Sequence, residues 1–520
     1  FPPIIVLVGP HTAHHGRAIA GNIRIVNNLH PQRRHSAAID QVEPLLQPVA
    51  DGHPAVAQLA AGMQMDRQLP HPDVAHYKQT AQADEQRIPH LVGNKQGGGQ
   101  HHQASSAITA DAFRAAADPA KFPEQIAKGL RPWQASKFYY TGAFGGQDSA
   151  PADTICRVDG NQFDPLLGRT YNELGSEARS MHMCQGMPQL YALPGPQPRT
   201  YVLHDTVLQH PKSDQNTDLF AGIDTGLRSL ARFGRGGSPA LGLAIDALDG
   251  QIRSARMAFE TKGIAGARAV LPQVLTTVRA LRSQLTSMHP DPDARFELDL
   301  RLEQKERQAE AAMRIAAGLR VDVLANDGLI VGGQSTRVTL RAFAGSGKGV
   351  AVKSVAFSGF EGTHECEPVA LEELRPFNCV STLTVPAAAK LTTAYWKRVP
   401  GRDYYDFDPE APFGLPFEPT PFNATITFTI DGIEQAVTYP VQYRNDGNVF
   451  SGEKRHELLV VPALAVRLGA DIVAFPGGGQ ARELGVTVVN HDKTAGQATV
   501  ALQVPKGWTV TPASETVAFA

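Results

Sequence analysis

The sequence predicts a modular protein with an α/β layer, then a helical hairpin and then β-sandwich domains. Helix and strand patterns alternate between about residues 100 and 235, helical spacing alone continues to 319, and period-two alternation follows. A chain of 520 residues is also expected to form two to four domains, because a single core stops growing well below that length. The expected domains are 100–235, 236–319, 320–455 and 456–520, preceded by an anomalous segment, 1–99.

The composition excludes two classes of partner. With 42% hydrophobic residues, 19% charged residues and a formal net charge of -2, the chain is neither disordered by composition nor basic enough to predict nucleic-acid binding. The apolar run 4–8 is too short to span a bilayer and lacks the flanks of a signal peptide, so we expect no membrane span. Because the chain starts at Phe1 and stops at Ala520 inside a strand-like pattern, we expect a fragment.

Residues 1–99 differ in composition from the rest. They hold half of the 18 histidines, Gln and Pro are dense, and Phe1 is the only Phe or Trp among them. Proline repeatedly interrupts any helical pattern, and so few large apolar residues build little core. We hypothesise that this segment comes from a wrong reading frame or a misassembled gene joined to genuine coding sequence.

Local signals place the elements of 100–235. The stretch SSAITADAFRAAADP has small and apolar residues on one helical face and an Asp-Pro pair at its end. The capping-box pattern Thr170-x-x-Glu173 opens a helix that is expected to reach about Gln185. The other expected elements are a short helix at 124–130, strands at 137–144 and 200–204, and a helix after Asp224. This order suits one half of an α/β sheet whose strands are joined by helical crossovers.

The pattern from 239 to 319 predicts a helical hairpin with a break at His289-Pro290. Within it, the run RLEQKERQAEAAMR places Glu303, Glu306 and Glu310 at helical spacing with Arg307 beside them. We interpret these charges as a solvated helix face without a binding role.

Strand patterns fill the remainder of the chain. Alternating apolar residues run through 426–430, Asp431-Gly432 predicts a hairpin turn, and a second run follows to Tyr443. A β-sandwich is the natural container for 320–455, and 456–520 has the pattern of a second, truncated sandwich. The final strands, around Trp508, are similar to Ig-like accessory modules of glycan-active enzymes.

The four cysteines are Cys156, Cys184, Cys366 and Cys379, and none has the C-x-x-C spacing of a thiolate zinc site. Any metal would need His and carboxylate ligands. Cys366 and Cys379 either pair, if the protein is exported, or remain two free buried thiols. The compartment stays open, with export or the periplasm as the working expectation.

Three segments between residues 100 and 230 resemble, in order, the second half of a zinc-dependent N-deacetylase domain of the PIG-L/LmbE family. They are GQHHQASSAITADAFRAAADP, PAKFPEQIAKGLRPWQASKFYYTG, and FDPLLGRTYNELGSEARSMHMCQGM, which DLFAGIDTGL continues. His102 matches a zinc-ligand position, and a helix N-terminus favours the neutral imidazole that a metal needs. The helix signature reads His182-Met183-Cys184-Gln185, with Cys in place of Ser, so His182 and Gln185 are expected to support the active site or to anchor the helix.

The resemblance implies a Rossmann-like α/β half and a zinc-dependent hydrolase that removes the N-acetyl group of an N-acetylglucosamine-type or related substrate. The family's A-H-P-D-D-E motif, with two zinc ligands and the general base, is absent here. Pro10-His11 and His71-Pro72-Asp73 are only degenerate echoes of it, and Gly99 stands where the family has an oxyanion-stabilising His. With one of three ligands and no identifiable catalytic residue, this chain is expected neither to bind zinc tightly nor to deacetylate. A divergent, inactive relative is the alternative if no other reading frame supplies the motif.

Two further patterns are better explained without a functional site. A metal site of His11, His14, His15, His101 and His102 lacks carboxylates and regular spacing. The stretch AGSGKGV lacks the first Gly and the final Ser or Thr of a phosphate loop, so we expect a β-turn.

The aromatic stretch from Tyr395-Trp396 through Tyr404-Tyr405 and Phe407 to Phe413, Phe417 and Phe422 is expected to pack in the core and at the edge of the sandwich. If these rings instead stack on sugars, the chain is a non-catalytic carbohydrate-binding or scaffold protein that acts through its β-sandwich modules. This is the alternative function that the sequence predicts.

Overall fold

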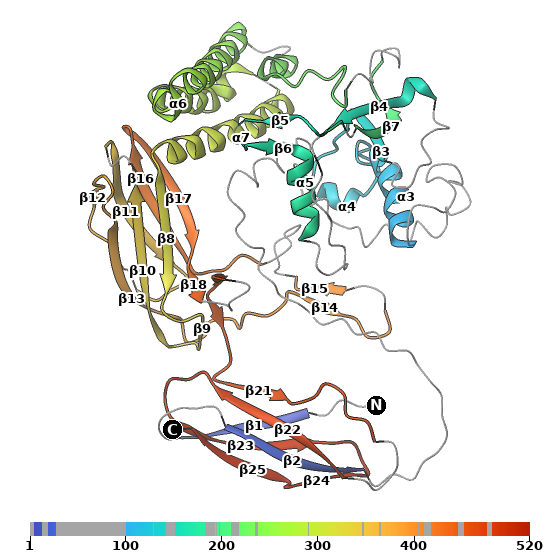
Figure 1. Ribbon diagram of the computed structural model, residues 1–520, viewed down its shortest axis with the longest axis vertical. Helices are drawn as coiled ribbons and strands as arrows, with labels where there is room; N and C mark the ends of the chain where they lie inside the picture. Colours follow the sequence, from blue (N-terminus) through green and yellow to red (C-terminus); the bar gives the residue numbers. More distant parts are fainter. Residues whose placement is uncertain are drawn as a thin grey trace.

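The computed structural model describes most of the chain after residue 99 and two strands before it (Figure 1). The described residues are 5–12, 19–27, 100–127, 129–141, 151–165, 167–181, 193, 195–196, 198–209, 218–234, 238–289, 291–345, 348–362, 364, 366–402, 405–409, 418–445, 452–475 and 481–519.

The α/β unit holds a small sheet with helices beside it. The sheet order is β3-β7-β4, and both neighbouring pairs are antiparallel. The sequence predicted strands joined by helical crossovers, whereas these three strands are antiparallel neighbours. The elements of the unit are α3 (Gln100–Ala115), α4 (Pro123–Ala127), β3 (Lys137–Thr141), η2 (Ala152–Thr154), β4 (Ile155–Asp159), β5 (Phe163–Asp164), β6 (Arg169–Thr170), α5 (Tyr171–Ser180) and β7 (Pro198–Thr206).

The capping box that the sequence predicts opens α5. The Thr170 hydroxyl accepts from the Glu173 backbone N–H at 3.2 Å, and the Glu173 carboxylate accepts from the Thr170 N–H at 2.7 Å. These reciprocal bonds satisfy two backbone donors that the first helical turn would otherwise leave open. Helix α5 is described as far as Ser180, and the predicted extension to Gln185 lies outside the described residues.

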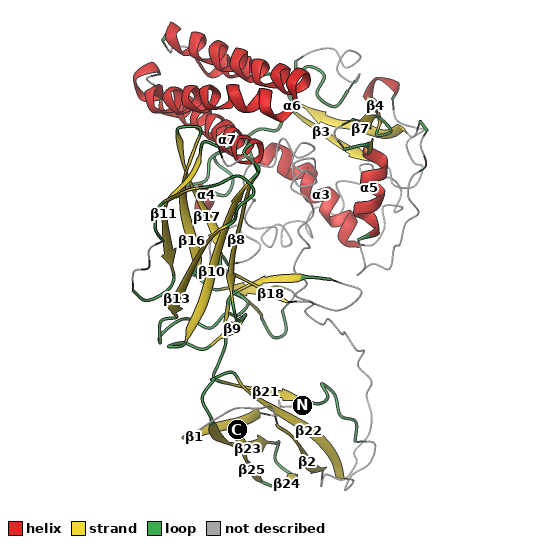
Figure 2. Cartoon of the chain, turned by 60° about the vertical axis from the view of Figure 1, so that its left-hand side comes forward, coloured by secondary structure: helices red, strands yellow, loops and turns green. Residues whose placement is uncertain are grey.

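The helical region contains η5 (Leu227–Gly234), α6 (Pro239–Met288) and α7 (Pro292–Ala316). As the sequence predicts, α6 ends before His289 and α7 restarts with Asp291 as its N-cap. Gly263 has φ of 66° and ψ of -158°, so the helix breaks there as well. The expected hairpin is therefore a three-helix unit of α6 before Gly263, α6 after it, and α7, which lie stacked on one another (Figure 2).

Ion pairs between α6 and α7 correct the interpretation of the acidic run as a solvated face. Glu306 accepts from Arg279 Nε at 2.8 Å and from Arg282 Nη1 at 2.7 Å, and its side chain is only 17% exposed. Glu310 also pairs with Arg279. The solvated interpretation is wrong for Glu306 and Glu310, because partner arginines on the neighbouring helix, 24 to 31 residues earlier, face them.

Two sheets follow the helices and pack face to face around a shared core. One has the order β13-β10-β8-β18-β19, the other β12-β11-β16-β17, and burial alternates along β10 and β16. Their strands are β8 (Leu319–Ala325), β10 (Ser335–Ala344), β11 (Val350–Ser358), β12 (Val369–Ala370), β13 (Phe377–Thr384), β16 (Asn423–Ile430), β17 (Ile433–Pro440), β18 (Gln442–Asn445) and β19 (Lys454–Glu457). The short strands β9 (Leu329–Ile330) and β20 (Leu459–Val460) form a separate parallel pair.

The core runs without interruption from the three-helix unit into this sandwich. Leu298 of α7, Leu340 of β10 and Phe428 of β16 belong to one buried cluster and are fully buried. A part-buried ion pair also joins them: Arg268 of α6 donates two hydrogen bonds of 2.8 Å to Asp431 in the turn between β16 and β17. Helices and sandwich therefore behave as one packed body, although their sequence periods differ.

The structure resolves the two alternatives for Cys366 and Cys379, because a disulfide joins them. Cys366 lies in the connection between β11 and β12, and Cys379 lies on β13. Strands β12 and β13 are edge strands of opposite sheets. The bridge therefore ties the two sheets together along one open side of the sandwich.

The C-terminal unit has a separate core and includes strands from the N-terminus. Its sheets have the orders β1-β23-β25 and β21-β22-β2-β24. The segment 456–520 was predicted to be a truncated sandwich. In the structure, two strands from the anomalous segment 1–99, β1 and β2, extend its sheets. The strands are β1 (Ile5–Thr12), β2 (Ile19–Asn27), β21 (Leu464–Leu468), β22 (Ala481–Asn490), β23 (Gly496–Gln503), β24 (Trp508–Thr511) and β25 (Ser514–Phe519).

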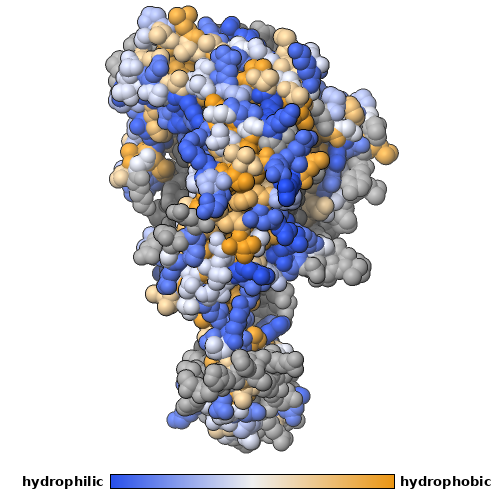
Figure 3. All heavy atoms as spheres, turned by 90° about the vertical axis from the view of Figure 1, so that its left-hand side faces the viewer, coloured by the Kyte–Doolittle hydropathy of each residue, from blue (hydrophilic) through white to orange (hydrophobic). Residues whose placement is uncertain are grey.

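The surface of the three-helix unit and sandwich is mixed in character. Figure 3 shows the face that lies on the left in Figure 1, and hydrophobic side chains on it are interspersed with hydrophilic ones. None of the helices among the described residues is long and apolar enough to cross a lipid bilayer.

Candidate functional site

His102, the single metal-ligand candidate, is the third residue of α3 and lies in its first turn. Its backbone is therefore at a helix N-terminus, as the sequence predicts, while its side chain is not among those described. His182 and Gln185 lie outside the described residues, so their predicted roles stay predictions.

The other end of α3 is fixed to the sheet. Phe113 stacks on Phe138 of β3 with ring centroids 6.0 Å apart, and Arg114 Nε donates to Asp205 Oδ2 of β7 at 2.8 Å. Hydrogen bonding to the Arg114 guanidinium lowers the pKa of Asp205. The Gln134 amide also donates to the Phe113 carbonyl at 2.9 Å. These contacts fix the direction in which α3 presents its first turn.

A group of titratable side chains lies on the sheet that α3 covers. Lys137 Nζ donates to the Tyr139 hydroxyl at 3.2 Å, and the thiol of Cys156 on β4 is fully buried. Burial lowers the pKa of Lys137, raises that of Tyr139 to about 12 and raises that of the Cys156 thiol, while Asp218 acts on all three. Tyr139 and Cys156 are therefore neutral at pH 7 and are weak nucleophiles. The sequence did not single out this group, because Lys137 and Tyr139 of β3, Cys156 of β4 and Asp218 are far apart in the chain.

A catalytic zinc site needs three protein ligands and an open position. Among the described residues, no three His, Cys, Asp or Glu side chains converge in a way that would hold a metal. The side chain of His102 is not among those described, so zinc binding by this chain stays a prediction.

The described residues support neither the metal site of five histidines nor a phosphate loop at AGSGKGV. His11 lies on β1, opposite Gln497 of β23, at the other end of the molecule from α3 (Figure 1). The AGSGKGV segment connects β10 to β11, and Gly349 takes a φ of 72° there. A phosphate loop leads into a helix, whereas this connection leads into a strand. His14, His15 and the His71-Pro72-Asp73 echo lie outside the described residues.

The aromatic stretch divides into a buried and an exposed part. Phe422 is 1% exposed and packs in the core, as predicted. Trp396 on β14 (Trp396–Arg398) and Tyr405 and Phe407 on β15 (Tyr405–Phe407) are instead 40%, 49% and 59% exposed. The prediction of core and edge packing is wrong for these three rings, because the two short strands form a separate hairpin that pairs with no other strand in the described part of the chain. Tyr404, Phe413 and Phe417 lie outside the described residues.

The exposed rings are held in a defined arrangement. Trp396 and Tyr405 meet edge to face at 5.1 Å with an interplanar angle of 84°, and Tyr395 lies 5.8 Å from Phe407. At the base of the hairpin, Lys390 pairs with Asp408 at 3.1 Å and with Glu418 at 3.5 Å. The hairpin therefore offers apolar ring surface beside charged hydrogen-bonding groups.

Comparison with known proteins assigns no family. No protein-family model matches the chain, and no curated protein matches it in sequence.

Proposed function

We propose that the chain derives from a modular, zinc-dependent hydrolase of the PIG-L/LmbE type, which removes N-acetyl groups from an N-acetylglucosamine-type or related substrate. The supporting observation is α3: it begins at Gln100, carries His102 in its first turn, and is fastened at its other end to the β3-β7 sheet. The ordered resemblance across residues 100–230 carries the family part of the proposal.

In this proposal the chain holds the supporting half of the active site and lacks the half with the remaining ligands and the general base. Zinc, when bound in the intact enzyme, would activate water for amide hydrolysis. For the chain as written, we expect zinc binding far below one equivalent and no release of acetate from an N-acetylated glucosamine oligomer.

Two measurements test this proposal separately. Metal analysis after dialysis against zinc, with His102→Ala as the matched variant, should give the same low zinc content for both chains. One equivalent of zinc in the chain as written, lost in His102→Ala, would show that the site is complete and the proposal of a half-site wrong. Reading the gene in all frames upstream of His101 tests the origin, because a frame that encodes a His-Pro-Asp-Asp-Glu-like string supports the derivation.

A second function, carbohydrate binding by the β modules, is favoured by the exposed rings of the β14-β15 hairpin. Aromatic faces bury the apolar C–H face of a sugar ring while neighbouring charged groups hydrogen-bond its hydroxyls. Trp396 and Tyr405 supply such faces, and Arg398, which pairs with Tyr405 in the hairpin register, is the charged residue on the same face of the two strands.

Isothermal titration with N-acetylglucosamine oligomers tests this function. Trp396→Ala should abolish binding, whereas Phe163→Ala, which removes a more exposed ring from the α/β unit (63% against 40% exposed), should leave it unchanged. Equal binding by both variants would exclude the hairpin as the sugar site.

A further inference from the structure

A large cleft separates the α/β unit from the three-helix unit. Its walls are the end of α3, α4, the connection from 129 to 138, the segment 220–232, and the facing sides of α6 and α7. The volume is about 1460 Å³, above the range of roughly 300–1,000 Å³ that is typical of small-molecule sites. Part of its wall, namely the end of α3, α4 and the segments 129–138 and 220–227, belongs to the proposed deacetylase half. The described residues that line it include neither a predicted site residue of that half nor a ring of the aromatic hairpin, so we treat the cleft as a separate site.

The cleft walls are strongly apolar for an open surface. Six large hydrophobic side chains that are more than a third exposed lie on them, and these are Ile126, Trp133, Phe220, Ile264, Phe296 and Ile315. They come from five separate segments, and their exposures range from 38% to 54%. Soluble proteins rarely gather so much exposed apolar surface in one concavity without a ligand to cover it.

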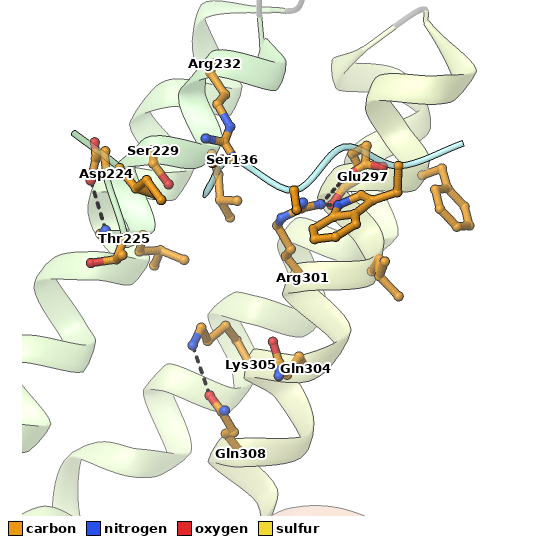
Figure 4. Close-up of a pocket in the computed structure, with 18 of the residues that line it drawn as sticks. Ser136, Asp224, Thr225, Ser229, Arg232, Glu297, Arg301, Gln304, Lys305 and Gln308 are labelled. Atoms are coloured by element: carbon orange, nitrogen blue, oxygen red, sulfur yellow. Dashed lines mark hydrogen bonds and ion pairs between the residues drawn. The ribbon is translucent and has the colours of Figure 1, made fainter. Parts of the chain in front are cut away.

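The same cleft carries a cluster of cations on its polar side. Arg232 of η5 and Arg301 of α7 each lie with the guanidinium carbon 4.8 Å from the centre of the Phe233 ring. Lys305 lies one helical turn beyond Arg301, and Figure 4 shows it reaching from α7 into the open space between the helices. The positive charges thus face the space that the apolar walls enclose.

Lys305 differs from the other cations in its partners. Arg301 pairs with Glu297 on its own helix, whereas Lys305 donates to the Gln308 amide oxygen at 3.1 Å. Desolvation alone lowers the pKa of Lys305, with no contribution from a carboxylate among the described residues. An ammonium group that has lost water and gained only an amide oxygen is stabilised by an anion placed beside it.

We propose that this cleft binds an amphiphilic anion, namely a carboxylate with a medium or long acyl chain. The chain lies against the exposed apolar side chains, and the carboxylate accepts from Lys305 Nζ. Charge complementarity selects the head, because cations and amides line the α7 wall, and the apolar walls select the tail. A small anion such as acetate would leave the apolar surface uncovered, and an alcohol would leave Lys305 without a counter-charge.

Isothermal titration of the full chain with dodecanoate, dodecanol and acetate, below micellar concentrations, tests the proposal. Dodecanoate should bind at one site per chain, dodecanol about tenfold more weakly, and acetate not measurably. Lys305→Gln should weaken dodecanoate by about tenfold and leave dodecanol unchanged. Lys506→Gln, an exposed lysine of the C-terminal unit, is the matched control and should bind like the unaltered chain.

A second variant keeps the test independent of Lys305. Ile315→Glu places an anion on the cleft wall at a half-exposed position, so it should abolish dodecanoate binding, whereas Leu243→Glu on the outer face of α6 should not. The proposal is overturned if dodecanoate and dodecanol bind equally, if Lys305→Gln binds dodecanoate normally, or if Ile315→Glu and Leu243→Glu behave alike. Circular dichroism of each variant separates loss of binding from loss of folding.

Discussion

The partly buried Glu306 carboxylate gives a sharp test of how α6 and α7 are joined. Replacing Glu306 by Gln keeps the side-chain volume and removes the charge that Arg279 and Arg282 share. Glu303→Gln is a matched control one turn earlier on the same helix. The Glu303 side chain is 34% exposed and its partner Arg307 is 74% exposed, whereas Glu306 is 17% exposed and its partner Arg282 is 26% exposed.

The expected cost follows from the number of bonds lost and from what remains. Two charge-assisted hydrogen bonds contribute about 1.5–3 kcal/mol each when they are sheltered from water. Arg279 keeps Glu310 and Arg282 keeps Asp299, so neither guanidinium is left without a carboxylate. We therefore expect about 2 kcal/mol for Glu306→Gln, less than the roughly 3–5 kcal/mol of a fully buried charge left alone. For Glu303→Gln we expect about 0–1 kcal/mol.

Urea unfolding followed by far-UV circular dichroism measures both variants, because α6 and α7 supply most of the helical signal. Since helices and sandwich share one core, Glu306→Gln should lower the melting temperature by roughly 4–8 °C. High salt should remove the small effect of Glu303→Gln and preserve most of the larger one. If the two variants unfold at the same urea concentration, the interhelical network contributes nothing and the acidic run is a solvated face after all.

Three other perturbations follow from the structure. Replacing Cys366 and Cys379 together by Ser should cost about 3 kcal/mol, because the bridge closes a loop with a separation of 13 residues; unchanged urea midpoints would contradict this. Arg114 holds the pKa of Asp205 below its usual 3.8, so the pair stabilises the fold fully above pH 3.8 and loses this effect as pH falls further. Asp205→Asn should remove that part of the acid dependence of unfolding, and an unchanged acid transition would refute the pairing. Thr170→Ala should destabilise α5 by about 1 kcal/mol, measured by hydrogen exchange of its first turn; unaltered exchange would rule out the cap.

Features that depend on a few adjacent residues could be predicted from the sequence. The Thr170-x-x-Glu173 capping box forms as expected, because the four residues contain both side chains and both backbone donors. The Asp431-Gly432 pair makes the predicted turn, with φ of 48° and 84°. In each case the energetic choice is made within one turn of chain, so periodicity and composition contain the necessary information.

Features that depend on distant partners could not be predicted in the same way. Strand β1 pairs with β23, almost 500 residues later, and nothing in either segment specifies the other. The break at Gly263 escaped detection because a glycine inside a helix costs only about 1 kcal/mol, so helical spacing on both sides outweighs it. The partners of Glu306 lie on another helix, and a helical wheel of α7 alone cannot distinguish a carboxylate that faces water from one that faces Arg279.

The aromatic hairpin shows why residue type alone did not predict which rings are exposed. An aromatic ring stabilises a protein by burial, so a cluster of rings next to strand patterns predicts a core. Burial, however, needs a second layer, and this hairpin, with three paired residues on each strand, has no neighbouring strand among the residues that the structure describes. Phe422, in contrast, directly precedes β16, whose alternate residues are buried in the shared core, and it is 1% exposed. Whether a ring is buried or exposed is therefore decided by the number of layers that the topology provides, and that number depends on strand pairing across the whole chain.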